Sequence, residues 1–262
     1  MRQTFAKNWP HYLAEAAGLG FFMTCASLFT TLLQYPGSAL NGALKEPLSR
    51  LIVLGVLMGC VIAAVVYSPW GKKSGAHINP AVTLAFWRLG KITASDAIFY
   101  TLFQFLGGLV AVQIMGLILG AAFRHPAINH VVTIPGGSGA GKAFIAEFAI
   151  SFILMLVLLL LSNSKKTEKL AGLGAGILIA LYLMFESPYS GMSLNPARTF
   201  ASAFAAREWS GLWIYFAAPC LAMLLAAEVF LRIVKGRVEV PAVPMEEPKK
   251  APPQPVAATS AA

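Results

Sequence analysis

The chain carries little charge for its length. Asp, Glu, Lys and Arg make up 12% of its 262 residues, about half the share of roughly 25% found in soluble domains. Hydrophobic residues make up 57% of the chain, and its mean hydropathy is +0.69. This composition excludes an ordinary soluble domain and predicts an integral membrane protein that has the lipid bilayer as its partner.

Acidic residues are scarcer than basic ones. Eleven Asp and Glu stand against 20 Lys and Arg, which gives a net charge of +9. The basic residues lie between apolar runs and near the chain ends, as they do in the cytoplasmic loops of membrane proteins. No polar segment interleaves basic with aromatic residues, so the positive charge does not indicate nucleic-acid binding.

Cysteine is also rare, with three residues that all fall within apolar runs. None has the spacing of a zinc site, and His77 has no second His or Cys at ligand spacing. We therefore expect no metal and no other cofactor. No nucleophile–base pair or pair of carboxylates can be placed together, so we do not expect an enzyme.

The chain contains apolar segments of two lengths, six long ones and two short ones. A segment of about ten residues forms a helix of roughly 15 Å, half the ~30 Å thickness of the hydrocarbon core. Such a segment is expected to enter the membrane as a re-entrant half-helix that lines a cavity. The fold class predicted is therefore an all-α membrane protein with six transmembrane helices and two half-helices. The expected spans are residues 11–34, 48–70, 95–123, 141–162, 168–187 and 210–234, and the half-helices are 79–88 and 195–206.

The basic residues also predict the topology. They cluster after the second and fourth spans and in both terminal segments. With six spans, these segments lie on one side, which is expected to be the cytoplasmic side of a plasma or inner membrane. Residues 1–234 are then the membrane domain. Residues 235–262 are rich in Pro and Ala and are expected to form a disordered cytoplasmic tail.

The tripeptide Asn-Pro-Ala occurs twice, each time within the pattern Ser-Gly-x-x-x-Asn-Pro-Ala. An Ala-Glu pair opens the first and the fourth span, so residues 11–123 and 141–234 form two repeats of two spans, a half-helix and a third span. Three spans per repeat is an odd number, and the repeats must therefore cross the membrane in opposite directions around a site at its midplane. The residues of the two boxes are Asn79, Pro80, Ala81, Asn195, Pro196 and Ala197.

Each box has the chemistry of a helix start. Asn is a preferred N-cap and Pro a preferred first helical residue. The Asn carbonyl oxygen can accept bonds from the first turn, which leaves its NH₂ group for a lumen. Each half-helix N-terminus adds about half a positive charge. Asn79 and Asn195 are therefore expected to offer donors to a small neutral solute while cations are repelled, and a water held there would interrupt proton transfer along the pore.

These boxes, the two Ala-Glu pairs and Arg198, three residues after Asn195, resemble the aquaporin (major intrinsic protein) family over about residues 11–234. The resemblance implies a passive hourglass pore for water and small uncharged solutes, assembled as a homotetramer. Unwound segments before each box would line the pore with carbonyl groups, and an outer selectivity filter would surround Arg198. The carbonyl segments are Gly75, Ala76, His77, Gly191, Met192 and Ser193, and the filter residues are Gly59, Leu183, Met192 and Arg198.

The filter positions follow from fixed offsets, twenty residues before Asn79 and twelve and three before Asn195. Helix packing is an open alternative for Gly59, because Gly55 and Gly59 form a small-xxx-small pair. Ordinary core packing is the alternative for the other two positions, Leu183 and Met192.

Signals on selectivity conflict. Strict water channels of the family pair a Phe and a His with the Arg, whereas Gly59 and Leu183 stand here and predict a wider, less polar constriction. Thr199 and Ala203 occupy the places of the Asp and Lys of glycerol facilitators, which favours water. A channel for water, possibly with small neutral solutes, and a facilitator for glycerol, urea, metalloid hydroxides or hydrogen peroxide both stay open.

Two acids, Glu15 and Glu147, lie within apolar spans, one in each repeat. Intramembrane acids can serve proton relays, so an ion-coupled secondary transporter is a further alternative. We favour a structural role, in which each acid accepts hydrogen bonds from the unwound segment of a box.

Overall fold

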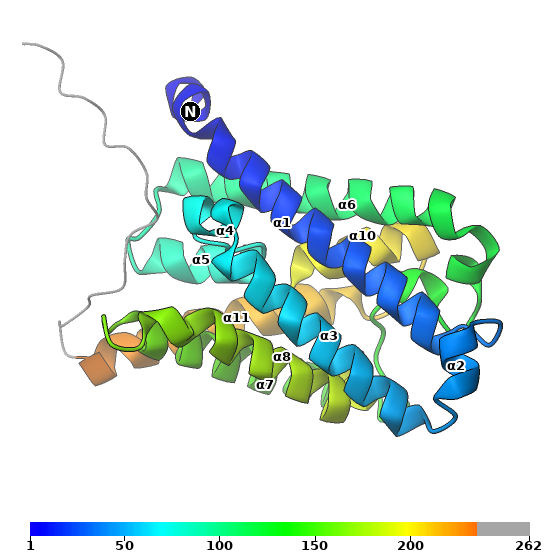
Figure 1. The fold of residues 1–262 in the computed structure, drawn as a ribbon. Coiled ribbons are helices and arrows are strands. Elements are labelled where there is room, and N and C mark those ends of the chain that lie inside the picture. Colours follow the sequence, from blue (N-terminus) through cyan, green and yellow to red (C-terminus); the bar gives the residue numbers. More distant parts are fainter. Residues whose placement is uncertain (235–262) are drawn as a thin grey trace, which may run out of the picture.

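The computed structural model describes residues 1–234, which form a bundle of long helices around two short ones (Figure 1). No strand occurs among these residues, and six helices are long and apolar enough to span a membrane. The prediction of a disordered tail at 235–262 lies outside the described residues. The long helices are α1 (Arg2–Gln34), α3 (Pro47–Tyr67), α6 (Ala94–Arg124), α7 (Ala140–Ser162), α8 (Ala171–Phe185) and α11 (Leu212–Val234).

The two half-helices begin at the prolines of the two boxes. They are α5 (Pro80–Arg88) and α10 (Pro196–Ala206), with lengths of roughly 14 and 17 Å. The predicted all-helical fold with six spans is thereby confirmed. The remaining elements are short: α2 (Ala39–Ala43), α4 (Pro69–Ser74), α9 (Ser187–Ser190) and the 3₁₀ turns η1 (Asn129–Val131) and η2 (Glu168–Leu170).

Several boundaries differ from the expected ones. Helix α1 begins nine residues earlier and runs through Pro10, because Asn8 and Tyr12 both donate to the buried carboxylate of Asp96, at 3.0 and 2.6 Å. These bonds fix the first turns of α1 against the start of α6. The second span ends at Tyr67 rather than residue 70, because Ser68 caps α4 and accepts from the Gly71 amide.

The helices pack in pairs that follow the repeat. Helix α1 packs against α6, α7 against α11, and α3 against α8 across the two halves. Each half-helix contacts the third span of the other half, α5 against α11 and α10 against α6. Equivalent tyrosines reach equivalent carbonyls, since Tyr100 Oη donates to Ser74 O and Tyr215 Oη donates to Ser190 O. The two unwound segments therefore meet at the centre of the bundle.

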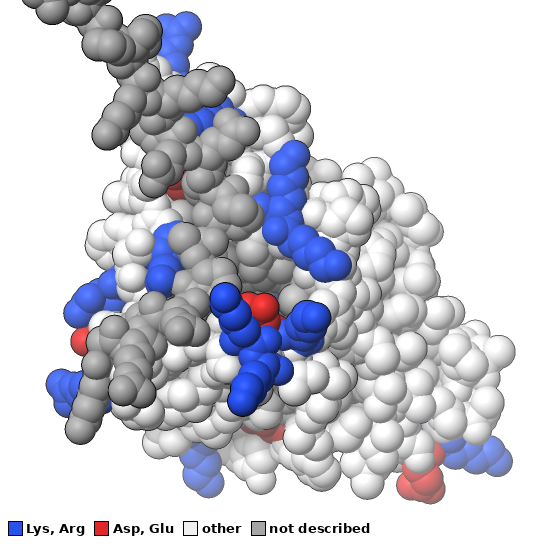
Figure 2. Space-filling model, turned by 60° about the vertical axis from the view of Figure 1, so that its left-hand side comes forward, with Lys and Arg blue, Asp and Glu red and all other residues white. Residues whose placement is uncertain are grey.

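Basic side chains gather at one end of the bundle. Figure 2 shows Lys and Arg side chains gathered on this face. Lys72 and Lys73 of α4 and Lys165 and Lys166 of the α7–α8 connection are exposed. An ion pair between Arg88 and Glu228, 2.6 Å apart, joins α5 to α11 at the same end. The face expected to be cytoplasmic is thus the one at which α4, the end of α5 and the α7–α8 connection lie.

Candidate functional site

Two asparagines start the half-helices at the centre of the molecule. The Asn79 Oδ1 atom accepts from the Ala81 amide at 2.9 Å. Its counterpart on Asn195 accepts from the amides of Ala197 and Arg198, at 3.0 and 3.2 Å. Both asparagines are in extended conformation and both helices continue with Pro. The N-terminal partial charges of α5 and α10 therefore meet at one place.

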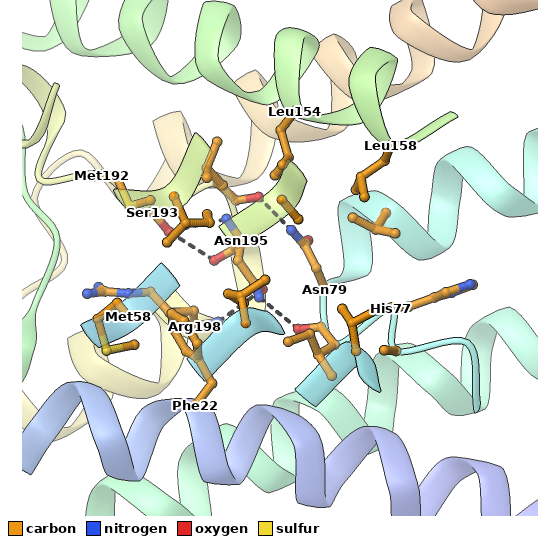
Figure 3. A pocket seen from close by; sticks show the side chains of 18 of the residues that line it. Phe22, Met58, His77, Asn79, Leu154, Leu158, Met192, Ser193, Asn195 and Arg198 are labelled. Carbon is orange, nitrogen blue, oxygen red and sulfur yellow. Dashed lines mark hydrogen bonds between the residues drawn. The ribbon is translucent and has the colours of Figure 1, made fainter. Parts of the chain in front are cut away.

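The same asparagines join the two halves. Asn79 Nδ2 donates to Leu194 O and Asn195 Nδ2 donates to Ile78 O, both at 2.8 Å (Figure 3). An amide NH₂ group carries two hydrogens, so each asparagine keeps a second N–H beyond this bond. The Asn-Pro pattern predicts a free NH₂ group on each asparagine and does not reveal the two accepting carbonyls, because no local pattern shows which carbonyl lies opposite.

A cavity of about 200 Å³ passes these asparagines. Its outer walls are apolar and include Phe22 of α1, Ile62 of α3 and Leu154 of α7. Apart from the hydroxyl groups of Thr30 and Ser162, the polar groups come from the two unwound segments and boxes. These contribute Gly75, Ala76, His77, Ile78 and Asn79 from the first half and Met192, Ser193, Leu194, Asn195 and Arg198 from the second.

The first unwound segment is held by Glu15, which is fully buried. Its carboxylate accepts from Ser74 Oγ at 2.6 Å, from the amides of His77 and Ile78, and from Gln104 Nε2 at 2.7 Å. Four donors surround the two oxygens. A carboxylate held in this way orients the backbone beside it and has little capacity left to carry protons.

The second segment repeats the arrangement with Glu147, which is also fully buried. This carboxylate accepts from Ser190 Oγ at 2.8 Å and from the amides of Ser193 and Leu194 at 2.7 and 2.8 Å. The contacts match the structural role expected for both acids. Neither carboxylate lines the cavity, an arrangement that favours bracing over ion coupling.

The unwound segments have a strained backbone. Four of their non-glycine residues have positive φ values: 50° at Ala76, 42° at Ile78, 53° at Met192 and 62° at Leu194. For any residue except Gly, this backbone conformation costs of order 1–3 kcal/mol. The N–H groups committed to the buried acids hold this conformation. The carbonyls of these residues are then left to the cavity side, where two of them accept from the asparagines.

The two halves brace their segments with different side chains. His77 Nδ1 lies 3.1 Å from Thr83 Oγ1 in the first half. In the second half a chain of hydroxyls links Ser193 to Thr199 and Thr199 to Thr133, the latter at 2.8 Å. His77 both lines the cavity and braces its loop. The box residues Pro80, Ala81, Pro196 and Ala197 are buried and do not line the cavity.

Two of the residues expected along the pore, Gly59 and Gly191, are not among those that line the cavity. A Cβ atom at Gly59 would lie 2.4 Å from Gly176 O, so Gly59 is where α3 and α8 approach each other and it does not line the cavity. Gly191 does not line the cavity either. It ends α9 with φ +81°, and its amide donates to Ser187 O at 2.8 Å.

Met58 takes the place expected for Gly59. It lines the cavity together with Leu183, Met192 and Arg198, and Figure 3 shows Met58 and Met192 at the same end of the cavity as the Arg198 side chain. The wall at this end of the cavity therefore combines two thioethers, one aliphatic side chain and one guanidinium. Among the described residues, Arg198 Nη1 is buried and has no hydrogen-bond partner.

Comparison with known families agrees with this geometry. The family model "Major intrinsic protein" matches residues 2–230. The chain belongs to the major intrinsic protein family. The recognition made from the boxes is confirmed, and so are the expectations of a multi-pass membrane protein and of a chain that is not an enzyme.

Named relatives of this major intrinsic protein include animal and plant members. Aquaporin-4 of Bos taurus is 31% identical over 211 residues, which cover 78% of this chain and 64% of the bovine protein. Nodulin-26 of Glycine max is 30% identical over 226 residues, 83% of this chain and 75% of nodulin-26. The X-ray structure of the aquaglyceroporin from Plasmodium falciparum has a TM-score of 0.72 at 18% identity, with 86% of this chain and 96% of that chain covered, which shows the shared fold.

The helix-packing role of Gly59 can be tested in this major intrinsic protein. Gly59→Ala forces a methyl group against backbone, so we expect the unfolding temperature in detergent to fall by roughly 3–10 °C. Gly116→Ala is the matched control, because a Cβ there meets nothing within 4 Å. Equal unfolding temperatures for the two variants would contradict the close packing of α3 on α8.

Glu186 is a buried acid that the sequence analysis did not single out. It follows α8, and among the described residues neither carboxylate oxygen has a hydrogen-bond partner. Burial raises the pKa of Glu186 to about 7, and repulsion from Glu147 acts in the same direction. The folded protein therefore holds a proton on Glu186 that the unfolded chain releases near pH 4.5.

This raised pKa predicts a stability that depends on pH. The contribution of Glu186 is fully present below pH 4.5 and is lost as the pH rises toward about 7, because the folded state binds the extra proton. The unfolding temperature of the parent should fall as the pH rises across this window, and the unfolding temperature of Glu186→Gln should fall less. Parallel pH profiles for the two proteins would show that Glu186 does not titrate in this range.

Proposed function

We propose that this protein is a passive channel for water and small neutral solutes. The reciprocal bonds of Asn79 and Asn195 at two opposed helix N-termini carry the proposal. Each amide keeps one N–H for a passing oxygen, and the nearby carbonyls supply acceptors. Such a set replaces the hydrogen bonds that a water molecule or an alcohol leaves behind in bulk solvent.

The same groups discriminate against ions. The N-termini of α5 and α10 contribute about half a positive charge each, and the Arg198 guanidinium adds a full charge at one end of the cavity. A cation is repelled by these positive charges. The cavity also offers too few acceptors to replace the water molecules of its hydration shell. A water whose oxygen accepts from both asparagines turns its hydrogens away from the centre on both sides, which interrupts proton transfer.

A facilitator for somewhat larger neutral solutes is the second candidate. The filter formed by Met58, Leu183, Met192 and Arg198 contains no aromatic ring and no imidazole. Its thioether and aliphatic side chains are flexible and can move aside. Urea, glycerol and metalloid hydroxides are the solute classes to test. Relatives that carry the names aquaporin and nodulin-26, and a structural neighbour named aquaglyceroporin, support the channel class for both candidates.

We further propose that the channel lies in a plasma or inner membrane with both termini in the cytoplasm, as a homotetramer. The exposed lysines at one end of the bundle support the orientation. The outer surface is rich in exposed apolar side chains, such as Ile52 and Val56 on α3 and Ile177 and Leu181 on α8. These exposed apolar side chains can pack against lipid or against a neighbouring copy of the chain.

Stopped-flow light scattering of proteoliposomes tests the proposed function. Osmotic shrinkage should be severalfold faster than that of empty vesicles, while a pH gradient across the same membrane should persist. Parallel gradients of glycerol and urea distinguish the two candidates. Shrinkage at the rate of empty vesicles under all three gradients would overturn the proposal, and saturable uptake driven by a pH gradient would favour the transporter instead.

A further inference from the structure

We propose that Met58 and Met192 form an oxidation site that closes this pore when hydrogen peroxide passes through it. The inference rests on the proposed function as a channel for small neutral solutes, because the pore is the route by which peroxide reaches the two sulfur atoms. It adds a modification site to the filter that the geometry defines.

The two thioethers lie in the wall of the cavity. Met58 comes from α3 of the first half and Met192 from the unwound segment of the second, and both line the cavity beside Arg198 (Figure 3). Their exposed fractions are only 3% and 5%, so dissolved oxidant gains access to them through the cavity and hardly at all from the surface. A peroxide molecule is neutral, small and able to donate and accept hydrogen bonds, as the proposed solutes are.

Hydrogen peroxide can oxidise a methionine thioether without any further reactant. The sulfur lone pair attacks one peroxide oxygen, a sulfur–oxygen bond forms, and the oxygen–oxygen bond breaks. The departing oxygen takes up the remaining proton and leaves as water. Sulfur loses two electrons to the peroxide, and the product is methionine sulfoxide, which turns a flexible apolar side chain into a polar one.

Arg198 has a hydrogen-bond donor that can hold an oxidised methionine. Among the residues that the structure describes, its Nη1 atom is buried and without an acceptor. A sulfoxide oxygen on either neighbouring methionine is a strong acceptor, and a hydrogen bond to a charged donor is among the stronger ones in proteins. The oxidised side chain would thus be held across the filter, where the permeating solute otherwise passes.

The experiment uses proteoliposomes of a full-length parent in which the three cysteines, Cys25, Cys60 and Cys220, are replaced by serine, so that thiol oxidation plays no part. After peroxide treatment and removal of the oxidant, osmotic water permeability should fall by roughly tenfold. Mass spectrometry of the peptides should show one added oxygen on Met58 or Met192. The fully buried Met23 and Met155 should stay unmodified.

Two variants test where the effect arises. Met58→Leu combined with Met192→Leu removes both sulfur atoms at nearly constant volume, and its water permeability should not respond to peroxide. Met184→Leu is the matched control. Met184 packs near Gly55 and does not line the cavity, so this variant should lose permeability as the parent does.

Each outcome decides the matter. Sulfoxide on Met58 or Met192 with unchanged permeability overturns the closing role, and so does an equal loss of permeability in the double variant. Absence of sulfoxide at both positions overturns the modification site. Untreated vesicles without water flux would refute the proposed function, and the peptide masses would still report separately whether the two sulfur atoms are oxidised.

Discussion

Glu147→Ala should remove nearly all folded protein from the membrane. The substitution leaves the amides of Ser193 and Leu194 and the hydroxyl of Ser190 without their acceptor in the interior. A buried group that loses its partner costs about 1–3 kcal/mol, and three such losses rival the whole stability of a typical domain, roughly 5–15 kcal/mol. The measurement is the yield of monodisperse protein in detergent and its unfolding temperature.

For Glu147→Gln, the yield and the unfolding temperature should lie between those of Glu147→Ala and those of the parent. The glutamine side-chain oxygen can still accept hydrogen bonds. The glutamine NH₂ group, however, then faces a donor whose hydrogen bond the second carboxylate oxygen accepts in the parent. Glu168→Ala is the control, because Glu168 is exposed outside the bundle core. Normal yield and unchanged unfolding temperature for Glu147→Ala would show that the second unwound segment holds its conformation without the carboxylate.

Arg198→Val should leave water permeability in place and open the channel to small cations and protons. A unit charge about 4 Å from a passing cation costs about 4 kcal/mol at an effective dielectric constant of 20, which is roughly a thousandfold in occupancy. Arg198 lines the cavity, whereas Arg124 is exposed at the end of α6 and serves as the control in Arg124→Val.

The test is proton and sodium leak into vesicles loaded with a pH-sensitive or sodium-sensitive dye, with water permeability measured on the same preparation. A leak in Arg198→Val no greater than that in Arg124→Val would show that the guanidinium is not the barrier. The asparagine pair and the two helix N-termini would then have to exclude ions by themselves.

The parts of the site that the sequence made predictable are local ones. Asn followed by Pro defines the cap and first turn of a helix, so the starts of α5 and α10 could be placed to the residue. The pairing of each buried acid with an unwound segment followed from the repeat, since a carboxylate in an apolar span needs donors and the segment before each box has free amides.

The rotation of α3 about its axis could not be predicted in this way. The count of twenty residues back from Asn79 follows the spacing of the resembled family and contains no information on how α3 is rotated in this chain. A shift of one residue turns a side chain by about 100°, so the count pointed to Gly59 instead of Met58. Close packing of Gly59 on Gly176 fixes the rotation, and that contact spans the two halves.

The two reciprocal asparagine bonds also set an order of events during synthesis. Asn79 donates to a carbonyl 115 residues further along the chain. At about 5–20 residues per second, the ribosome needs roughly 6–23 s to make that partner. For this time the first half-helix sits in the bilayer, or waits at its edge, with an amide that lacks its acceptor. We therefore expect the first half alone to be a target for quality-control proteases, and the two boxes to become protected together only after the second half has entered the membrane.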